Sequence, residues 1–213
     1  MEFLPEEIDK YASSHTSGEP QYLTDLQQET WQKVLVPRML SGHFQGRLLS
    51  MISHLVKPNF ILEIGTYTGF SALCLAEGLQ NGGELHTIDI NEELHTIQSK
   101  YIAQAGMTDL IKLHVGNALD VIPQLNQHWD LVFIDADKEN YLAYYNLVME
   151  NLKPGAHILI DNVLWSGKVT EEVSKNDRET KTLVELNSLI QSDNRVENIL
   201  LPVRDGLTLV RVL

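Results

Sequence analysis

Five short apolar runs alternate with stretches of helical spacing in the middle of the chain. The runs cover residues 59–65, 84–90, 110–116, 129–135 and 156–161. Each run is almost continuously apolar, which is typical of strands buried on both faces of a parallel sheet. The stretches between them place apolar residues three and four positions apart, as amphipathic helices do. The helix over residues 139–152 is expected to end at the Pro154-Gly155 turn. The alternation predicts an α/β fold with helices on both faces of a mostly parallel sheet.

The two ends of the chain depart from this alternation. Residues 195–203 and 206–213 predict two strands joined at Arg204-Asp205-Gly206, and Asp-Gly is a common β-hairpin turn. A loop this short cannot join parallel strands, so at least one of the two runs antiparallel. Residues 1–58 carry amphipathic helical stretches and no strand pattern. We expect one domain over residues 1–213, with residues 1–58 as a helical N-terminal extension that helps to cover the site.

Composition narrows the functional classes. The 213 residues suit one α/β domain, and the 16 Lys and Arg against 29 Asp and Glu give a net charge of -13. That charge argues against a protein that mainly covers phosphate backbones. The single cysteine, Cys74, excludes an internal disulfide and lies in an apolar helical run, so we expect it to be buried. No secretory leader or membrane-length apolar run is evident, which predicts a cytoplasmic protein.

Candidate chemistry begins where the first two strands end. Gly65-Thr66-Tyr67-Thr68-Gly69 is a glycine turn that enters a helix, which offers backbone N–H groups to a ligand. Asp89 ends the second strand, where an acid suits the two hydroxyls of a ribose, although it would also serve as a helix cap. Tyr67 stands where dinucleotide-binding motifs have a glycine, which disfavours an NAD-dependent oxidoreductase. A nucleoside without a phosphate chain, such as S-adenosylmethionine, fits better.

The next three strand ends are also polar. Gly116-Asn117-Ala118 follows the third strand and suits either an adenine edge or a simple turn. Asp135 ends the fourth strand and Asp161-Asn162 the fifth, so their oxygens should converge at one sheet edge. Such a donor set, without His or Cys, predicts a site for Mg²⁺, Mn²⁺ or Ca²⁺. Two carboxylates this close repel unless a cation neutralises them. The alternative for Asp161 is a residue that opens an Asx turn.

Two further residues lie beside this cluster. Asp137 is interpreted as the N-cap of the following helix. Lys138 falls in the first turn of that helix, where the helix dipole disfavours a lysine. Beside a cation and partly buried, Lys138 is a candidate general base. Its alternative role is that of an ordinary solvated surface lysine.

The motifs together resemble one family, the cation-dependent O-methyltransferases that include the caffeoyl-CoA and catechol enzymes. The resemblance runs in order from about Val36 to the C-terminus. It is carried by residues 62–71, Asp89, residues 133–141, residues 161–167 and residues 205–209. It implies a Rossmann-like methyltransferase fold, with a seven-stranded, mostly parallel sheet whose last strand is antiparallel.

The resemblance also implies roles for individual residues. Asp135, Asp161 and Asn162 would bind the divalent cation, with Mg²⁺ the expected ion. Lys138 falls where catechol enzymes place their base. Ser41 falls in a segment that closes over the cofactor in plant members. The residues implied to hold S-adenosylmethionine are Ser41, Glu63, Gly65, Thr66, Ser71, Asp89, Ala118 and Asp135.

The predicted activity is therefore divalent-cation-dependent transfer of a methyl group from S-adenosylmethionine to a hydroxyl of a small, catechol-like acceptor. Trp165 and Tyr141 would wall that acceptor or simply pack in the core. The resemblance implies a homodimer, and the apolar Tyr144, Tyr145 and Val148 suggest a helix that covers a partner.

Two alternatives stay open. One is methylation of a 5-hydroxyuridine at the tRNA wobble position on the same fold and metal site. Basic residues would then line one mouth of the site: Lys33, Arg38, Arg47, Lys57, Lys168 and Lys175. The other is a non-catalytic nucleoside-binding module, which gives no reason for Lys138. The sequence names neither the acceptor nor which of its hydroxyls is methylated.

Overall fold

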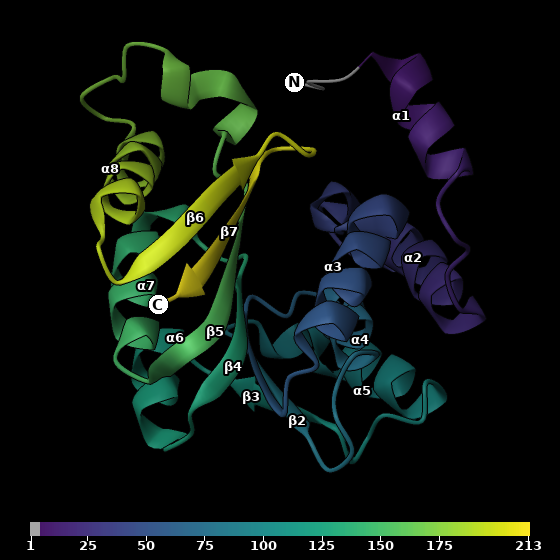
Figure 1. Cartoon of the computed structure of the whole chain (residues 1–213). Helices are drawn as coiled ribbons and strands as arrows, with labels where there is room; N and C mark the ends of the chain where they lie inside the picture. The colour runs from purple at the N-terminus through teal and green to yellow at the C-terminus, as the bar shows by residue number, and fades with distance from the viewer. Residues whose placement is uncertain (1–4) are drawn as a thin grey trace.

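One seven-stranded sheet, with strand order β3-β2-β1-β4-β5-β7-β6, organises the molecule (Figure 1). The computed structural model describes residues 5–213. Strands β1 to β5 pair in parallel, and β7 runs antiparallel to both β5 and β6. The strands are β1 (Phe60–Ile64), β2 (Glu84–Asp89), β3 (Ile111–Val115), β4 (Trp129–Ile134), β5 (Leu152–Asp161), β6 (Val196–Leu201) and β7 (Leu207–Val212). The predicted fold class is confirmed.

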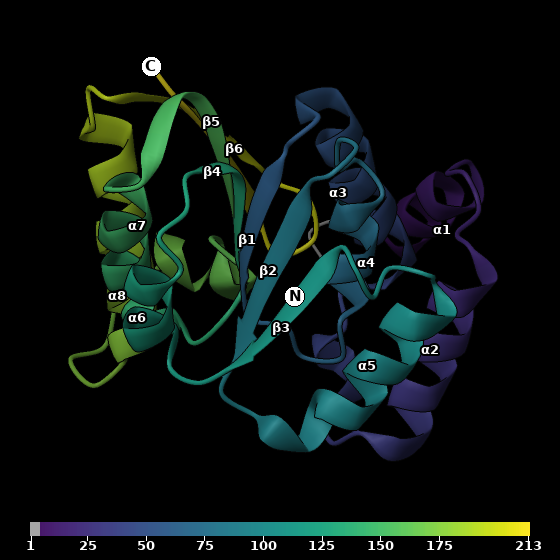
Figure 2. The same ribbon diagram turned by 90° about the horizontal axis from the view of Figure 1, so that it is seen from below.

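Helices cover both faces of the sheet, as both views show (Figures 1 and 2). One face carries α1 (Glu6–Ser14), α2 (Gln21–Lys33), α3 (Gly42–Val56), α4 (Phe70–Ala76) and α5 (His95–Gln104). The other carries α6 (Ala118–Val121), α7 (Tyr141–Met149) and α8 (Arg178–Ser192). Short 3₁₀ turns join them: η1 (Pro37–Met39), η2 (Glu92–Leu94), η3 (Ile122–Gln124), η4 (Lys138–Asn140) and η5 (Trp165–Thr170).

The continuous apolar strands make two cores, one on each side of the sheet. Within β4, Val132 and Ile134 pack toward α6, α7 and α8, whereas Leu131 and Phe133 pack toward α2 to α5. This alternation follows from the strand pleat, which sends successive side chains to opposite faces. Burial on both faces explains why the strand reads as an unbroken apolar run.

The N-terminal extension contributes to the core that lies between the sheet and helices α2 to α5. Leu23 and Leu26 of α2 and Leu49 of α3 are fully buried there. Gly46 lets α3 approach α4 closely, because a Cβ at this position would lie 2.6 Å from the Phe70 ring. By contrast, α1 buries no residue. Among residues 5–213, none of the helices has the length and apolarity needed to span a bilayer.

Two sequence-based expectations about α7 are wrong. We expected this helix to end at Pro154-Gly155, but α7 ends at Met149, and Pro154-Gly155 lies in the exposed first half of β5. There β5 pairs with β4 across a register irregularity, so a proline without an N–H is tolerated. Tyr144, Tyr145 and Val148 are buried in the core of their own chain, so they give no evidence of a partner.

Candidate active site

The strand order reverses between β1 and β4, and the predicted site residues lie at this carboxyl edge. Ile134 of β4 is in register with Ile160 of β5, so Asp135 and Asp161 follow a pair of neighbouring residues. Asp135 is tied to the next strand as well, because its backbone N–H donates to the Ile64 carbonyl at 2.9 Å. Reversal points of this kind are where open α/β sheets bind their ligands.

Gly65 is required by the close packing of this edge. Its φ is +103°, and a Cβ there would lie 1.9 Å from the backbone oxygen of Asp135. Any side chain would therefore collide with the β4 strand end, whatever ligand the turn holds. The glycine turn after β1 and the acid after β4 form one structural unit.

Asp161 is a buried carboxylate beside the partly exposed carboxylate of Asp135. Asp161 is 4% exposed, and its Oδ2 accepts a 2.7 Å hydrogen bond from Gln45 Nε2. Burial, and next the charge of Asp135, raise the pKa of Asp161 to about 7. Burial and a neighbouring negative charge both disfavour the ionised form of Asp161.

The donor chemistry at this edge fits a hard cation. Asn162, whose side chain carries an amide oxygen, follows Asp161 directly and has a left-handed φ of +60°. Across residues 5–213, no group of three or more His, Cys, Asp and Glu side chains is arranged to hold a metal. An ion bound here would therefore take Asp135, Asp161 and Asn162 and complete its shell with water or substrate, as Mg²⁺ commonly does.

The β6–β7 hairpin holds the loop that carries Asn162. Leu164 N–H donates to the Asp205 carbonyl at 2.9 Å, and Ser166 N–H donates to Asp205 Oδ1 at 2.5 Å. A Cβ at Gly206 would lie 2.5 Å from Leu164 Cγ, so the hairpin turn packs directly on the loop. The Asp-Gly turn thus supports the site as well as joining two strands.

Lys138 is not a surface lysine, so that alternative is wrong. It is 6% exposed, and its Nζ donates to Asp135 Oδ1 at 3.1 Å, to the Ala136 carbonyl at 3.0 Å and to the Tyr141 hydroxyl at 2.6 Å. An ammonium has three N–H groups, so every donor is matched. An ammonium has no lone pair, so Lys138 can accept a proton only after it has lost one of these three, which leaves one of the contacts without its donor.

The two aromatic residues considered as acceptor walls differ in position. Tyr141 is fully buried below Lys138, and its hydroxyl donates to the Asp161 carbonyl at 3.3 Å, so it links the two halves of the site instead. The Trp165 ring centroid lies 5.8 Å from Lys138 Nζ. Only Trp165 of the two remains a candidate wall.

Asp137 differs from the expectation that its side chain caps the following helix. It precedes η4 at the N-cap position, but its carboxylate accepts no cap hydrogen bond from the backbone. It accepts instead from the Tyr144 hydroxyl at 2.6 Å and from Asn140 Nδ2 at 2.5 Å. Asp137 therefore fixes the start of α7 through side chains and does not face the carboxylate pair in these contacts.

Asp89 is tied to the glycine turn and is not the helix cap. Its Oδ2 accepts from Tyr67 N–H at 2.7 Å and its Oδ1 from Asn91 N–H at 2.8 Å. The capping role falls to Asn91, whose side chain accepts from Glu93 N–H at 3.0 Å. The Asp89 carboxylate is thus oriented by the turn after β1, as a group that binds a ligand between β1 and β2 should be.

Glu63 is a fully buried carboxylate with spare hydrogen-bonding capacity. Its Oε2 accepts from Thr87 Oγ1 at 2.5 Å, whereas Oε1 has no partner within the described chain. Burial raises the pKa of Glu63 to about 8, with Ser71 and Thr87 opposing the shift. A buried oxygen without a donor suits a ligand that brings its own, such as an ammonium group.

The remaining predicted cofactor residues lie in the loops around this edge. Thr66 and Ser71 are buried in and after the glycine turn, and Ala118 begins α6 after the Asn117 cap. Ser41 is buried immediately before α3, and α3 reaches the acid edge through Gln45. The structure therefore brings the Ser41 segment close to this edge.

Of the six basic residues proposed to line a tRNA mouth, Lys168 lies 5.9 Å from the Trp165 ring, whereas Arg47, Lys33 and Lys57 do not gather at the site. Arg47 is paired with Glu77 at 2.9 Å, and Lys33 with Glu29 at 2.9 Å. Lys57 follows the last residue of α3, at the opposite end of that helix from Ser41. These three residues lie on different parts of the molecule.

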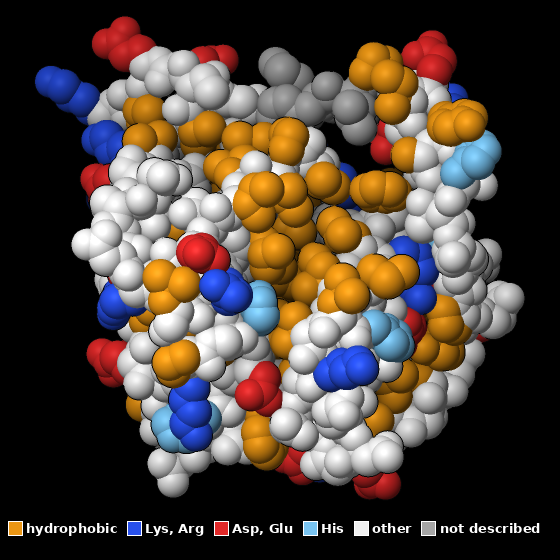
Figure 3. Space-filling model, in the orientation of Figure 1, with side chains coloured by type: hydrophobic (Ala, Val, Ile, Leu, Met, Phe, Trp, Pro, Cys, Tyr) orange, Lys and Arg blue, Asp and Glu red, His pale blue; other side chains and the backbone are white. Residues whose placement is uncertain are grey.

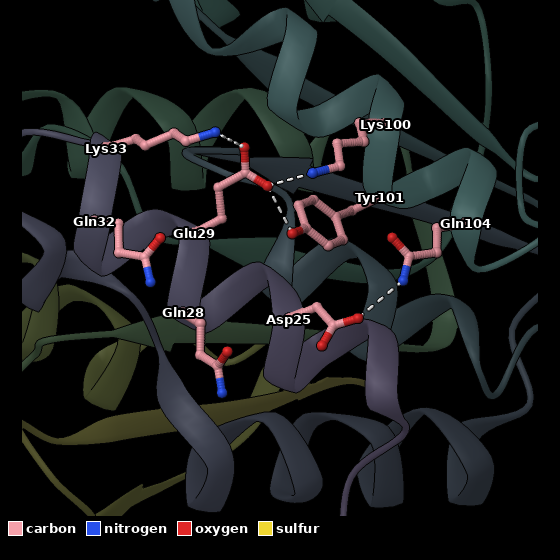
Figure 4. A pocket seen from close by; sticks show the side chains of 8 residues that line it. All are labelled: Asp25, Gln28, Glu29, Gln32, Lys33, Lys100, Tyr101 and Gln104. Atoms are coloured by element: carbon pink, nitrogen blue, oxygen red, sulfur yellow. Dashed lines mark hydrogen bonds and ion pairs between the residues drawn. The ribbon is translucent and has the colours of Figure 1, made fainter.

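Two surface hollows lie away from the site. A polar groove of about 290 Å³ separates α2 from α5, where Glu29 accepts hydrogen bonds from Lys33, Lys100 and Tyr101 (Figure 4). A larger, mostly apolar hollow of about 630 Å³ lies along the outer side of α3, beside Phe44. Neither is lined by a residue predicted to hold the cation or S-adenosylmethionine. The site is therefore identified by the polar residues that meet at the strand ends, and not by the size of a cavity.

Sequence reasoning missed Gln45 and Thr87, which contact Asp161 and Glu63. Gln45 lies 116 positions before its partner, and no motif spacing connects the two. One signal was present: Gln45 lies on the same face of α3 as Leu49 and Ile52, where a polar residue is unusual. Thr87 had no such signal, because threonine is ordinary in a strand.

Comparison with known proteins agrees with this geometry. Residues 12–213 match the O-methyltransferase family. The chain belongs to that family. A caffeoyl-CoA O-methyltransferase from Eucalyptus globulus is 36% identical and aligns over 81% of this chain and 74% of its own. One from Nicotiana tabacum is 34% identical, over 81% and 77%.

Solved structures show the same fold. An O-methyltransferase from Bacillus cereus, solved with SAH, has a TM-score of 0.91 and 30% identity over 97% of both chains. TomG, an O-methyltransferase from Streptomyces achromogenes solved with SAM, has a TM-score of 0.88 and 30% identity over 97% of this chain and 96% of its own. The predicted resemblance and enzyme class are confirmed by these members of the family.

Proposed function

We propose that this O-methyltransferase moves the methyl group of S-adenosylmethionine to a hydroxyl of a small, vicinal dihydroxy aromatic acceptor, with a divalent cation, Mg²⁺ by expectation. The observation that carries the proposal is the paired ending of β4 and β5 in Asp135 and Asp161, with Asn162 beside them. The caffeoyl-CoA relatives support the acceptor class. The SAM-bound and SAH-bound structures of family members support the methyl donor.

The residues after β1 and β2 would hold the methyl donor. Asp89, oriented by Tyr67 N–H, offers acceptors to the ribose hydroxyls. Glu63 has a free buried oxygen suited to the ammonium of the methionine part. Gly65, Thr66, Ser71 and Ala118 would line the space between, and Ser41 would cover it. Because these side chains stand on a rigid sheet edge, they fix the sulfonium methyl for in-line attack.

The residues after β4 and β5 would hold the acceptor. Asp135, Asp161 and Asn162 would bind the cation, which, when bound, supplies Lewis-acid chemistry that lowers the pKa of a hydroxyl beside it. Lys138 is the proposed proton acceptor in its neutral amine form, in which one of its three contacts lacks a donor until the proton is taken up. Trp165 would provide an apolar surface for the aromatic ring. Exclusion of water assists a transfer in which a charged sulfonium becomes a neutral thioether.

Turnover of labelled S-adenosylmethionine with a catechol acceptor tests the proposal. We expect activity with Mg²⁺ or Mn²⁺ and its loss in EDTA. Asp161→Ala should lose metal binding, whereas Asp137→Ala, which removes an acid bonded only to Tyr144 and Asn140, should keep it. Full activity in chelator would refute the cation requirement.

The tRNA alternative is weaker, because Arg47 and Lys33 are already paired with acids. A gel shift with tRNA at two salt concentrations separates the two acceptors, and we expect no specific band. A non-catalytic role is disfavoured by membership of an enzyme family. The homodimer and the cytoplasmic location stay predictions.

A further inference from the structure

Gln45 is a buried amide that reaches the proposed metal site from outside the sheet. It is 3% exposed on the inner face of α3, and its Nε2 donates to Asp161 Oδ2 at 2.7 Å. Buried polar side chains are costly unless their hydrogen bonds are made. A leucine would suit this face of α3 better, so the amide points to a role at Asp161.

The helix that carries Gln45 is held firmly against α4. Gly46 permits close contact with the Phe70 ring. Ser53 Oγ donates to the Leu75 carbonyl at 2.6 Å, and Arg47 makes two 2.9 Å hydrogen bonds to Glu77. These contacts along α3 fix its position and rotation. The Gln45 amide is therefore placed by a rigid element, which is what precise support of a ligand requires.

The chemistry of the contact is that of an orienting hydrogen bond. An ionised carboxylate only accepts hydrogen bonds, so the amide nitrogen must face Asp161. With Oδ2 held, Oδ1 is left for another partner. The amide is neutral, so it orients Asp161 without cancelling its charge, whereas the ammonium of Lys138 contacts Asp135.

We propose that Gln45 is a positioning residue for the divalent cation: it holds Oδ2 of Asp161 and leaves Oδ1 as the ligating oxygen. The inference rests on the proposed metal site and deepens it. It also connects the N-terminal extension to that site, since α3 begins beside Ser41. Residues that orient metal ligands typically change metal affinity about 10–100-fold when they are replaced.

The test is Mn²⁺ binding to Gln45→Met, measured by calorimetry on the full chain without S-adenosylmethionine. Methionine keeps the length of the side chain and removes the donor. We expect Mn²⁺ affinity to fall about 10–100-fold, with the affinity for SAH nearly unchanged. In turnover, the half-activating Mg²⁺ concentration should rise while kcat at saturating Mg²⁺ recovers.

Ser53→Ala is the matched control. It removes a buried hydrogen bond from the same helix, far from Asp161, so it should lower stability and leave Mn²⁺ affinity unchanged. If Gln45→Met does not fold, Gln45→Asn replaces it: the amide stays, but it is one methylene too short to reach Asp161, and the same loss is expected.

The outcomes separate this inference from the proposed function. If the wild type binds Mn²⁺ and Gln45→Met binds it equally well, Gln45 does not position the ligand, and the proposed function stands. If the wild type itself binds no divalent cation, the metal site and the inference both fail.

Discussion

Asp89 serves two neighbours in the folded chain, accepting hydrogen bonds from the backbone of Tyr67 and of Asn91. If it also binds the ribose, Asp89→Ala should weaken SAH binding by about 1–3 kcal/mol, the scale for loss of a partner by buried polar groups. Calorimetry measures this directly. Asn91→Ala is the control, because it removes the cap of η2 and leaves the Tyr67 contact intact. Unchanged affinity in Asp89→Ala would limit Asp89 to bracing the turn.

The three N–H groups of Lys138 each have an acceptor, and the proposed role as a general base can be tested directly. If it accepts the acceptor's proton, Lys138→Met should lower the rate at neutral pH about 10²–10⁴-fold. The loss should shrink as pH rises, because the acceptor hydroxyl then ionises without help. A pH–rate profile of variant and wild type, with acceptor saturating and then limiting, measures both effects.

The control for Lys138 is Lys168→Met. Lys168 lies at a similar distance from the Trp165 ring, 5.9 Å against 5.8 Å, but its side chain is 53% exposed. We expect this variant to change the rate less than about twofold, as exposed substitutions usually do. If Lys138→Met weakens binding of the methyl acceptor but leaves the rate at saturating acceptor unchanged, Lys138 binds the acceptor and does not act as its base.

Residues differed in how well the sequence predicted them. Asp135, Asp161 and Asn162 were predictable, because each directly ends a strand and parallel strands end at one edge. Gln45 was not, since its contact joins a helix and a strand end that are distant in sequence. The contacts of Lys138 were not predictable either, because they depend on the 3₁₀ turn η4.

At the scale of elements, α2 is held to α5 mainly through the Glu29 carboxylate, with a further hydrogen bond from Gln104 to Asp25. Hydrogen bonds from Lys100, Lys33 and Tyr101 lower the pKa of Glu29 to about 2 from an ordinary 4.5. A lowered pKa stabilises the folded state fully above pH 4.5, and this contribution is lost as pH falls toward 2. Glu29→Gln should therefore unfold more easily at pH 7 and approach the wild type as pH falls.

Urea unfolding at pH 7, 4 and 3 measures this difference. Glu7→Gln on α1 is the control, because Glu7 is exposed and makes no bond among those of the described residues. A Glu29→Gln deficit that stays constant over this range would mean that the carboxylate acts through packing and not through its charge.

The order of the elements was predicted well, and their ends less well. Strands buried on both faces show as apolar runs, so β1 to β5 could be read directly. The end of α7 was misplaced, because Pro154-Gly155 usually terminates a helix but here begins an exposed strand segment. Sequence patterns show whether a segment is a helix or a strand more clearly than they show the residue at which strand pairing begins.

At the scale of the whole molecule, acidic and apolar groups occupy different places. Apolar side chains gather on the face between the β6–β7 hairpin and α3 (Figure 3). A contiguous apolar surface is often an interaction site, so this face, and not α7, is where we expect the partner of the predicted homodimer. Some of the acids that are counted in the net charge of -13 are buried at the strand ends, and these include Glu63 and Asp161.

These buried acids imply that the site costs stability until its ligands bind. The pKa of Glu63 is raised to about 8 from 4.5. A raised pKa stabilises the folded state fully below pH 4.5, and that contribution is lost as pH rises through 8. Glu63→Gln cannot ionise, so without ligand it should gain stability over the wild type as pH rises from 4.5 to 9. At about 1.4 kcal/mol for each tenfold change in acidity, the difference between a pKa of 4.5 and one of about 8 bounds the gain at about 5 kcal/mol.

Denaturant unfolding of both proteins between pH 5 and pH 9 measures the gain, with Glu197→Gln as the control because that side chain is 65% exposed. Binding of SAH should show the opposite sign, because Glu63→Gln removes the charge that suits an ammonium group. If Glu63→Gln is more stable than the wild type but binds SAH more weakly, Glu63 serves ligand binding at the cost of stability. If the stability difference does not change with pH, the Glu63 carboxylate is already compensated in the free protein. Equal SAH affinity of the two proteins would exclude the open oxygen Oε1 from ligand binding.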